Sequence, residues 1–198
     1  AKLNSIGHLV RKLQLVKSRY APPTEPYIFD IIEGAGLGFV YTKRTSGFEP
    51  PIQVSGLGEI PRGSTIGIFG LEEDKVVDKL AELTEGKDVV AAYIPGVIML
   101  EKMLYRAGLG RRVYPLATFH DLMYLLYKIA AGQEKADVIV FSGLAIVNRL
   151  NPVDLVDYLR VLGAFEDYVE YRIIVDLVSE KEVIKSPLYE GVDYRIFL

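Results

Sequence analysis

The chain has 198 residues, of which half are hydrophobic and a quarter are charged, and its net charge is −3. This length suits one domain of moderate size, and the composition indicates a globular protein and excludes a disordered one. With no cysteine and two histidines, the chain cannot form disulfides or a thiolate metal site, and we expect no metal centre and no cofactor. No apolar run approaches the roughly 20 residues that cross a bilayer. The N-terminal residues contain no signal-peptide core, so we expect a cytoplasmic protein without a membrane partner. Asn and Gln are scarce, which is typical of a heat-adapted source.

Residues 2–19 are predicted to form an amphipathic helix, because apolar residues from Leu3 to Tyr20 recur at spacings of three and four. Residues 1–24 contain five basic residues and no acid, so this segment carries +5 and the remainder −8. The candidate contacts to nucleic acid or to a protein partner are Lys2, Arg11, Lys12, Lys17 and Arg19. Three roles stay open: the apolar stripe packs on the core, it docks on a partner, or the basic residues contact phosphates.

Residues 27–54 are predicted to contain strands and turns. Two β-type runs, 27–32 and 39–42, flank the glycine-rich stretch Gly34–Gly38 and predict a hairpin. The same glycines could form an anion-binding nest of backbone N–H groups. A second turn is expected near residues 46–51. Residues 1–60 are therefore expected to form a helix and a small β extension of a single domain.

From residue 61 onward, strands alternate with helices. Predicted strands at 65–69, 88–93, 112–114, 137–141 and 171–177 are followed or separated by predicted helices at 72–83, 97–106, 119–131 and 153–165. The strands are continuous apolar runs, as expected where both faces of a sheet are covered. This order predicts an α/β core over residues 61–198 with a mostly parallel sheet flanked by helices. Short strands near 182–184 and 194–198 are expected to complete it.

The stretch from Pro61 to Gly70 and the helix after it form the strand–loop–helix frame of a phosphate-binding P-loop. The working motif, G-x-x-x-x-G-K-[ST], needs a second glycine, a lysine and a hydroxyl. Counted from Gly70, those places hold Lys75, Val76 and Val77. Deleting one residue brings Lys75 to the lysine place but supplies neither the glycine nor the hydroxyl. Gly70 and Lys75 are thus the candidate nucleotide-binding residues, in a loop that has lost its usual chemistry.

The stretch Leu57 to Gly70 resembles the entry to the ATPase core of the RecA/RadA/KaiC superfamily, which typically reads G-G-G-I-x-x-G-x-[hydrophobic]-x-x-[IV]-[FY]-G there. The later segments 88–109, 112–122, 137–144 and 171–178 are similar to that family's following strands and helices in the same order. The resemblance covers about residues 55–198 and implies a RecA-like fold. It rests more on order and pattern than on invariant motifs.

The chain departs from that family at three catalytic places. The P-loop is altered, Ser142 stands at the Walker B aspartate position, and no acid follows the second strand, where the segment is Ala92 to Gly96. Hydrolysis of ATP needs positioned phosphates, a metal and an oriented water. The resemblance therefore implies a paralogue that is not an enzyme.

Two isolated residues could suggest other chemistry. Ser142 could be a nucleophile, but its flanks do not form the G-x-S-x-G motif, so packing at a strand end explains it better. His120 beside Asp121 could be an acid–base pair, although a pair at the start of a predicted helix is more often a cap.

The leading hypothesis is a non-catalytic RecA-like binding or scaffold protein with a protein partner or a homo-oligomeric assembly. Its resemblance implies a role beside a recombinase or a KaiC-type ATPase in DNA repair. Two alternatives stay open. One is a regulatory domain that binds ATP at the altered loop without hydrolysis. The other is a DNA-binding accessory protein that uses the basic N-terminal segment.

Overall fold

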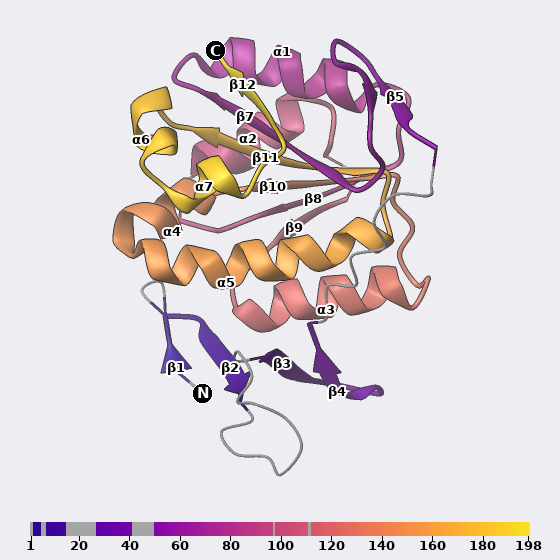
Figure 1. Ribbon diagram of the computed structural model, residues 1–198, viewed down its shortest axis with the longest axis vertical. Coiled ribbons are helices and arrows are strands. Elements are labelled where there is room, and N and C mark those ends of the chain that lie inside the picture. The colour runs from indigo at the N-terminus through magenta and orange to yellow at the C-terminus, as the bar shows by residue number, and fades with distance from the viewer. Residues whose placement is uncertain (1, 5–6, 15–26, 41–49, 97, 111) are drawn as a thin grey trace.

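A six-stranded parallel sheet forms the centre of the molecule in the computed structural model, which describes residues 2–4, 7–14, 27–40, 50–96, 98–110 and 112–198 (Figure 1). The strand order is β12-β7-β11-β10-β8-β9, and every neighbouring pair in it is parallel. The strands are β7 (Ser64–Gly70), β8 (Val89–Tyr93), β9 (Val113–Pro115), β10 (Val138–Ser142), β11 (Tyr171–Leu177) and β12 (Tyr194–Phe197). The predicted α/β class with a parallel sheet is confirmed.

Helices cover both faces of this sheet. One face packs against α1 (Glu73–Thr84) and α2 (Ile98–Arg106). The other face packs against α3 (Phe119–Ala130), α4 (Leu144–Leu150), α5 (Pro152–Gly163), α6 (Glu180–Ile184) and α7 (Pro187–Glu190), with a 3₁₀ turn at Ala164–Asp167. Residues that alternate along one strand enter different cores: Ile66 and Ile68 face α1, whereas Phe69 faces the opposite layer. This two-sided burial explains the continuous apolar runs Val138–Phe141 of β10 and Ile173–Val175 of β11.

The N-terminal residues form a second, antiparallel sheet with the order β1-β2-β3-β4. Its strands are β1 (Lys2–Leu3), β2 (Leu9–Leu13), β3 (Tyr27–Ile32) and β4 (Gly36–Phe39). Figure 1 shows this sheet next to α3 and α5, on the side away from the parallel sheet. The helix expected over residues 2–19 is wrong for the described part of that segment. Gly7 adopts a positive φ of 79° that turns β1 back onto β2, which a helix would not allow.

Polar contacts join the N-terminal sheet to the core. The Tyr158 hydroxyl of α5 lies 2.7 Å from His8 Nδ1 and accepts a hydrogen bond of 3.0 Å from Asn4 Nδ2. Lys12 Nζ lies 2.7 Å from Asp157 Oδ1. Burial lowers the pKa of His8, although Asp121 opposes this effect. The sheet is therefore held on α5 by a neutral histidine–tyrosine contact and by an ion pair.

Most predicted elements of the core are confirmed within one or two residues, and β11 has the predicted bounds. The hairpin around Gly34–Gly38 is also confirmed. Its second strand, β4, covers Gly36–Phe39 and not the predicted 39–42, of which 41 and 42 lie outside the described residues. The turn expected near 46–51 also lies almost wholly outside them. The strand expected at 182–184 is wrong, because Ser179 and Glu182 form a capping box that starts α6 there. A further hairpin of β5 (Ile52–Val54) and β6 (Gly58–Ile60) packs on the α1 side. None of the described helices combines the length and apolar character that a membrane crossing requires.

Candidate functional site

The candidate site is the edge of the parallel sheet where β7, β11, β10 and β8 end. Gly70 lies opposite Leu177, and Ser142 lies between Val175 and Tyr93 in the register of the sheet. In open α/β sheets, ligands bind outside the carboxyl ends of strands where successive connections leave to opposite faces. The chain leaves β7 and β8 toward the α1 face and leaves β10 and β11 toward the other face. The direction in which the chain leaves the sheet therefore changes between the neighbouring strands β7 and β11, and again between β10 and β8. Both of these switch points lie at this edge.

The connection after β7 is short. The strand ends at Gly70 and α1 begins at Glu73, so Leu71 and Glu72 are the whole connection. A Cβ atom on Gly70 would lie 2.5 Å from the carbonyl oxygen of Leu198. The Leu198 N–H donates to the Phe69 carbonyl at 2.8 Å, which holds this C-terminal residue in place. The backbone of Leu198 therefore occupies the space beside Gly70.

Carboxylates surround the first turn of α1. Lys75 Nζ pairs with Glu72 Oε1 at 2.8 Å, and both side chains are exposed. Arg106 of α2 contacts Glu73 at 2.5 Å and Asp74 at 2.6 Å, and these hydrogen bonds raise the pKa of Arg106. The acids are at the positive end of the helix dipole, which favours negative side chains. The basic groups at this point are thus already paired with acids of the chain itself.

The end of β10 is occupied by an internal carboxylate. Asp176 of β11 is buried and accepts hydrogen bonds from the backbone N–H groups of Gly143 at 2.5 Å and Ala145 at 2.9 Å. Burial raises the pKa of Asp176 to about 7, although these N–H groups act against the shift. The hydroxyl of Ser142 is also buried and has no hydrogen-bond partner among the described residues. Asp176 therefore satisfies the start of α4 and fills the position that an external anion would take.

The structure separates the two groups of predicted site residues. Gly70 and Lys75 lie at the carboxyl edge of the sheet, whereas Lys2, Arg11 and Lys12 lie in the N-terminal sheet on the far side of α3 and α5. Arg11 pairs with Asp30, and Lys12 pairs with Asp157. Lys17 and Arg19 lie outside the described residues. Arg11 and Lys12 are therefore each neutralised by an acid of the same chain.

Two other candidate residues have structural partners. Asp121 and Thr118 form a capping box at the start of α3, so Asp121 has the capping role that the sequence offers as the alternative to an acid–base pair. His120 Nδ1 lies 2.8 Å from Asp30 Oδ2, and Asp30 also contacts Arg11 through its other oxygen. Both histidines of the chain thus join the N-terminal sheet to helices of the core.

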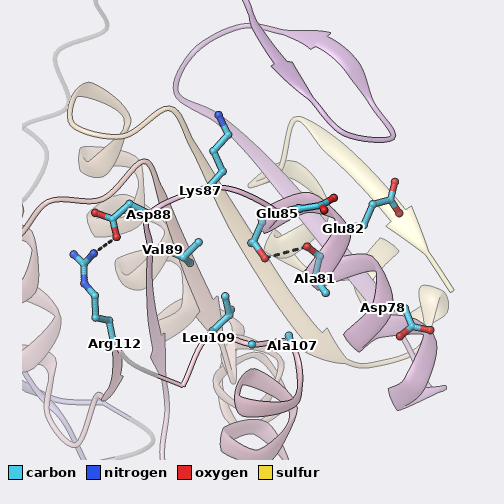
Figure 2. Close-up of a pocket in the computed structure, with 12 residues that line it drawn as sticks. Asp78, Ala81, Glu82, Glu85, Lys87, Asp88, Val89, Ala107, Leu109 and Arg112 are labelled. Carbon is cyan, nitrogen blue, oxygen red and sulfur yellow. Dashed lines mark hydrogen bonds and ion pairs between the residues drawn. The ribbon is translucent and has the colours of Figure 1, made fainter.

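A separate cavity of about 650 Å³ opens at the opposite edge of the sheet, next to the start of β8 (Figure 2). Figure 2 shows Asp78, Glu82 and Glu85 along α1 and the Arg112–Asp88 ion pair across from them. Glu82 pairs with Lys79, and Lys87 pairs with Glu170. Within the described residues, no group of three metal-ligating side chains could hold an ion. This cavity is a charged surface hollow without a preformed metal site in that part of the chain.

The arrangement of the sheet and its helices is similar to the solved structure of a prototypical ATPase from the type III secretion system of pathogenic bacteria. The TM-score is 0.55 and the sequence identity 13%, over 89% of this chain. The likeness shows that the two proteins share a fold, a parallel α/β sheet flanked by helices. This chain spans 65% of the length of that ATPase chain. No protein-family model matches the sequence, and no curated protein matches it.

Sequence reasoning missed two residues that define this edge. Asp176 ends the apolar run Ile173–Val175, and a lone acid inside a buried strand is a signal that could have marked it. Leu198 offers no such signal, because its place beside Gly70 depends on the parallel pairing of β12 with β7.

Proposed function

We propose that this protein is a non-catalytic, RecA-like ATPase relative that works by binding other macromolecules, as an accessory to a recombinase or a KaiC-type ATPase in DNA repair. The observation that carries the proposal is the two-residue connection between Gly70 and α1. A P-loop wraps phosphates with several consecutive backbone N–H groups and supplies a lysine and a hydroxyl. Leu71 and Glu72 are too few to make that cradle.

Electrostatics at the same edge supports the proposal. A triphosphate placed at the start of α1 would face the carboxylates of Glu72, Glu73 and Asp74. Lys75 and Arg106 are basic side chains beside these acids, and each is paired with them. Binding ATP there would require these ion pairs to break, and the like charges would repel the ligand.

The second catalytic position supports the same conclusion. Ser142 cannot replace the Walker B aspartate, because a neutral, buried hydroxyl does not hold Mg²⁺ through water. Asp176 is an acid close to the end of β10, but its oxygens accept the N–H groups that start α4. Neither Asp176 nor Ser142 therefore offers an oxygen atom that is free to bind a metal.

The proposal is tested by measuring release of inorganic phosphate from MgATP. We expect a rate equal to that of buffer alone, at any protein concentration. Release that rises in proportion to the protein and disappears in Lys75→Ala would overturn the non-catalytic assignment. Lys102→Ala, which replaces an exposed lysine on α2, is the matched control.

The alternative of a regulatory domain that binds ATP without hydrolysis predicts a different pattern. It requires calorimetric binding of MgATP that Lys75→Ala removes and Lys102→Ala leaves intact, without phosphate release.

The DNA-binding alternative would require Arg11 and Lys12 to leave their partners Asp30 and Asp157. Binding to duplex DNA that falls steeply with added salt would favour it over our proposal.

A further inference from the structure

The outward face of the N-terminal sheet is apolar. An antiparallel sheet with one solvated face normally places polar side chains on that face. Here the inward positions, such as Val10, Ile28 and Ile32, are buried on the core. Seven large hydrophobic residues of the same four strands are 39% to 62% exposed: Leu3, Leu9, Leu13, Tyr27, Ile31, Leu37 and Phe39. The sheet therefore has two apolar faces, and the described residues of the chain cover one of them.

The strand register makes these residues one continuous surface, which we call the outer face. Leu3 lies opposite Leu9 on β1 and β2, and Leu13 lies opposite Tyr27 on β2 and β3. On β3 and β4, Ile31 lies opposite Leu37. Phe29 lies opposite Phe39 with ring centres 5.7 Å apart. Each strand thus contributes to the outer face, and the apolar residues meet in cross-strand pairs.

The charged residues of β2 and β3 do not offer this face to a charged partner. Arg11 alternates with Leu9 and Leu13 and lies opposite Phe29, so it belongs to the outer face by register. Its guanidinium pairs with Asp30, which also contacts His120. Lys12 is on the inward side and pairs with Asp157. A partner for the outer face must therefore be apolar itself.

The area of the outer face matches one side of a stable dimer. With about 200 Å² for a fully exposed large side chain, the seven exposed fractions correspond to roughly 700 Å². The largest apolar patch on a typical monomer is about 300–600 Å², whereas a standard interface buries about 800 Å² per partner. We propose that a second copy of this chain packs on the outer face, sheet against sheet, about a two-fold axis. Two-fold interfaces use the same patch on both copies, and homodimer interfaces are more apolar than others.

This dimer goes beyond the proposed function and does not depend on it. In Figure 1 the N-terminal sheet lies on the far side of α3 and α5 from the parallel sheet. Pairing through the outer face therefore leaves the carboxyl edge with Gly70 and Asp176 uncovered. The dimer forms whether or not that edge binds a nucleotide, so the two proposals fail independently.

The test is the solution mass of the full chain, measured by sedimentation equilibrium over about 1 to 100 µM, a range that detects micromolar association. We expect twice the chain mass of 22.1 kDa. Leu37→Lys and Ile31→Lys each place two charges in a two-fold interface and should raise the dissociation constant at least about 100-fold. Leu150→Lys is the matched control, because Leu150 of α4 is 57% exposed against 61% for Leu37.

A dimer that Leu37→Lys and Ile31→Lys dissociate and that Leu150→Lys retains supports the proposal. A monomer across the whole range overturns it and leaves the outer face to a different protein. A dimer that survives both outer-face substitutions also overturns it, since the copies would then associate elsewhere. Circular dichroism of each variant verifies that the chain stays folded, and a monomeric mass of the unmodified chain overturns the proposal without any variant.

Discussion

Replacing Asp176 by asparagine should change how the stability of this protein depends on pH. Burial raises the pKa of Asp176 to about 7 in the folded chain, whereas an unfolded aspartate titrates near 3.9. Between these values the folded state binds more protons than the unfolded state, so the free energy of unfolding falls as pH rises. A difference of about 3 pK units corresponds to about 4 kcal/mol, of which roughly 3 kcal/mol is lost between pH 5 and pH 8.

The asparagine of the Asp176→Asn variant does not titrate, so the variant lacks this component. It keeps one acceptor for the N–H groups of Gly143 and Ala145 and loses the other, at a cost of about 1 kcal/mol or more. We therefore expect the two proteins to have similar stability at pH 5, and Asp176→Asn to be more stable than the unmodified chain by roughly 3 kcal/mol at pH 8. The assay is urea unfolding at pH 5, 6, 7 and 8.

The control for this experiment is Asp78→Asn, which replaces an exposed acid on α1 and should leave the pH dependence unchanged. The informative quantity is the stability difference between the unmodified chain and Asp176→Asn at each pH, because all other titrating groups cancel from it. A difference that stays constant from pH 5 to pH 8 would refute the raised pKa. It would show that the N–H groups of α4 stabilise the charged carboxylate more than burial opposes it.

Two further substitutions test the packing around the site and the N-terminal sheet. Tyr158→Phe removes the hydroxyl that contacts His8 and Asn4, so we expect urea unfolding to show a loss of about 1–3 kcal/mol; an unchanged midpoint would contradict the account of how that sheet is held. Gly143→Ala forces a side chain onto a φ of 98° and places its Cβ 2.9 Å from Ile94 Cβ, so the melting temperature should fall by several degrees, consistent with a cost of about 1–3 kcal/mol. Gly132→Ala is the comparison for Gly143→Ala and should cost less, because Gly132 has a positive φ but no atom within 4 Å of the added Cβ. Equal losses in the two glycine variants would show that the contact with Ile94 contributes nothing.

The sequence predicts the elements of the core well, because local pattern and tertiary environment agree there. The apolar residues Ile173–Val175 of β11 are buried on both faces of the sheet, and the predicted bounds of the strand are those observed. The segment Leu9–Leu13 shows the opposite case. Its leucines fit a helical spacing, but they also alternate with Val10 and Lys12, and the turn at Gly7 selects the strand. Periodicity alone does not decide between the two for so short a run.

The candidate site is only partly predictable from the sequence. The altered motif after Gly70 can be seen directly in the residue types. The contacts that complete the edge come from distant parts of the chain: Asp176 reaches the start of α4 from β11, and Leu198 reaches Gly70 from β12. α4 itself begins after Gly143, which has a left-handed conformation, and its first N–H groups are capped by the distant Asp176. The local sequence therefore contains no capping residue that would predict this helix.

Calorimetric titration of the unmodified chain with MgATP measures whether the carboxyl edge of the sheet holds a nucleotide. We expect no binding heat up to about 1 mM ATP, a limit that corresponds to an affinity weaker than about −4 kcal/mol. Binding with a micromolar dissociation constant that Lys75→Ala abolishes would contradict this expectation. It would mean that the Lys75–Glu72 ion pair opens to admit a phosphate.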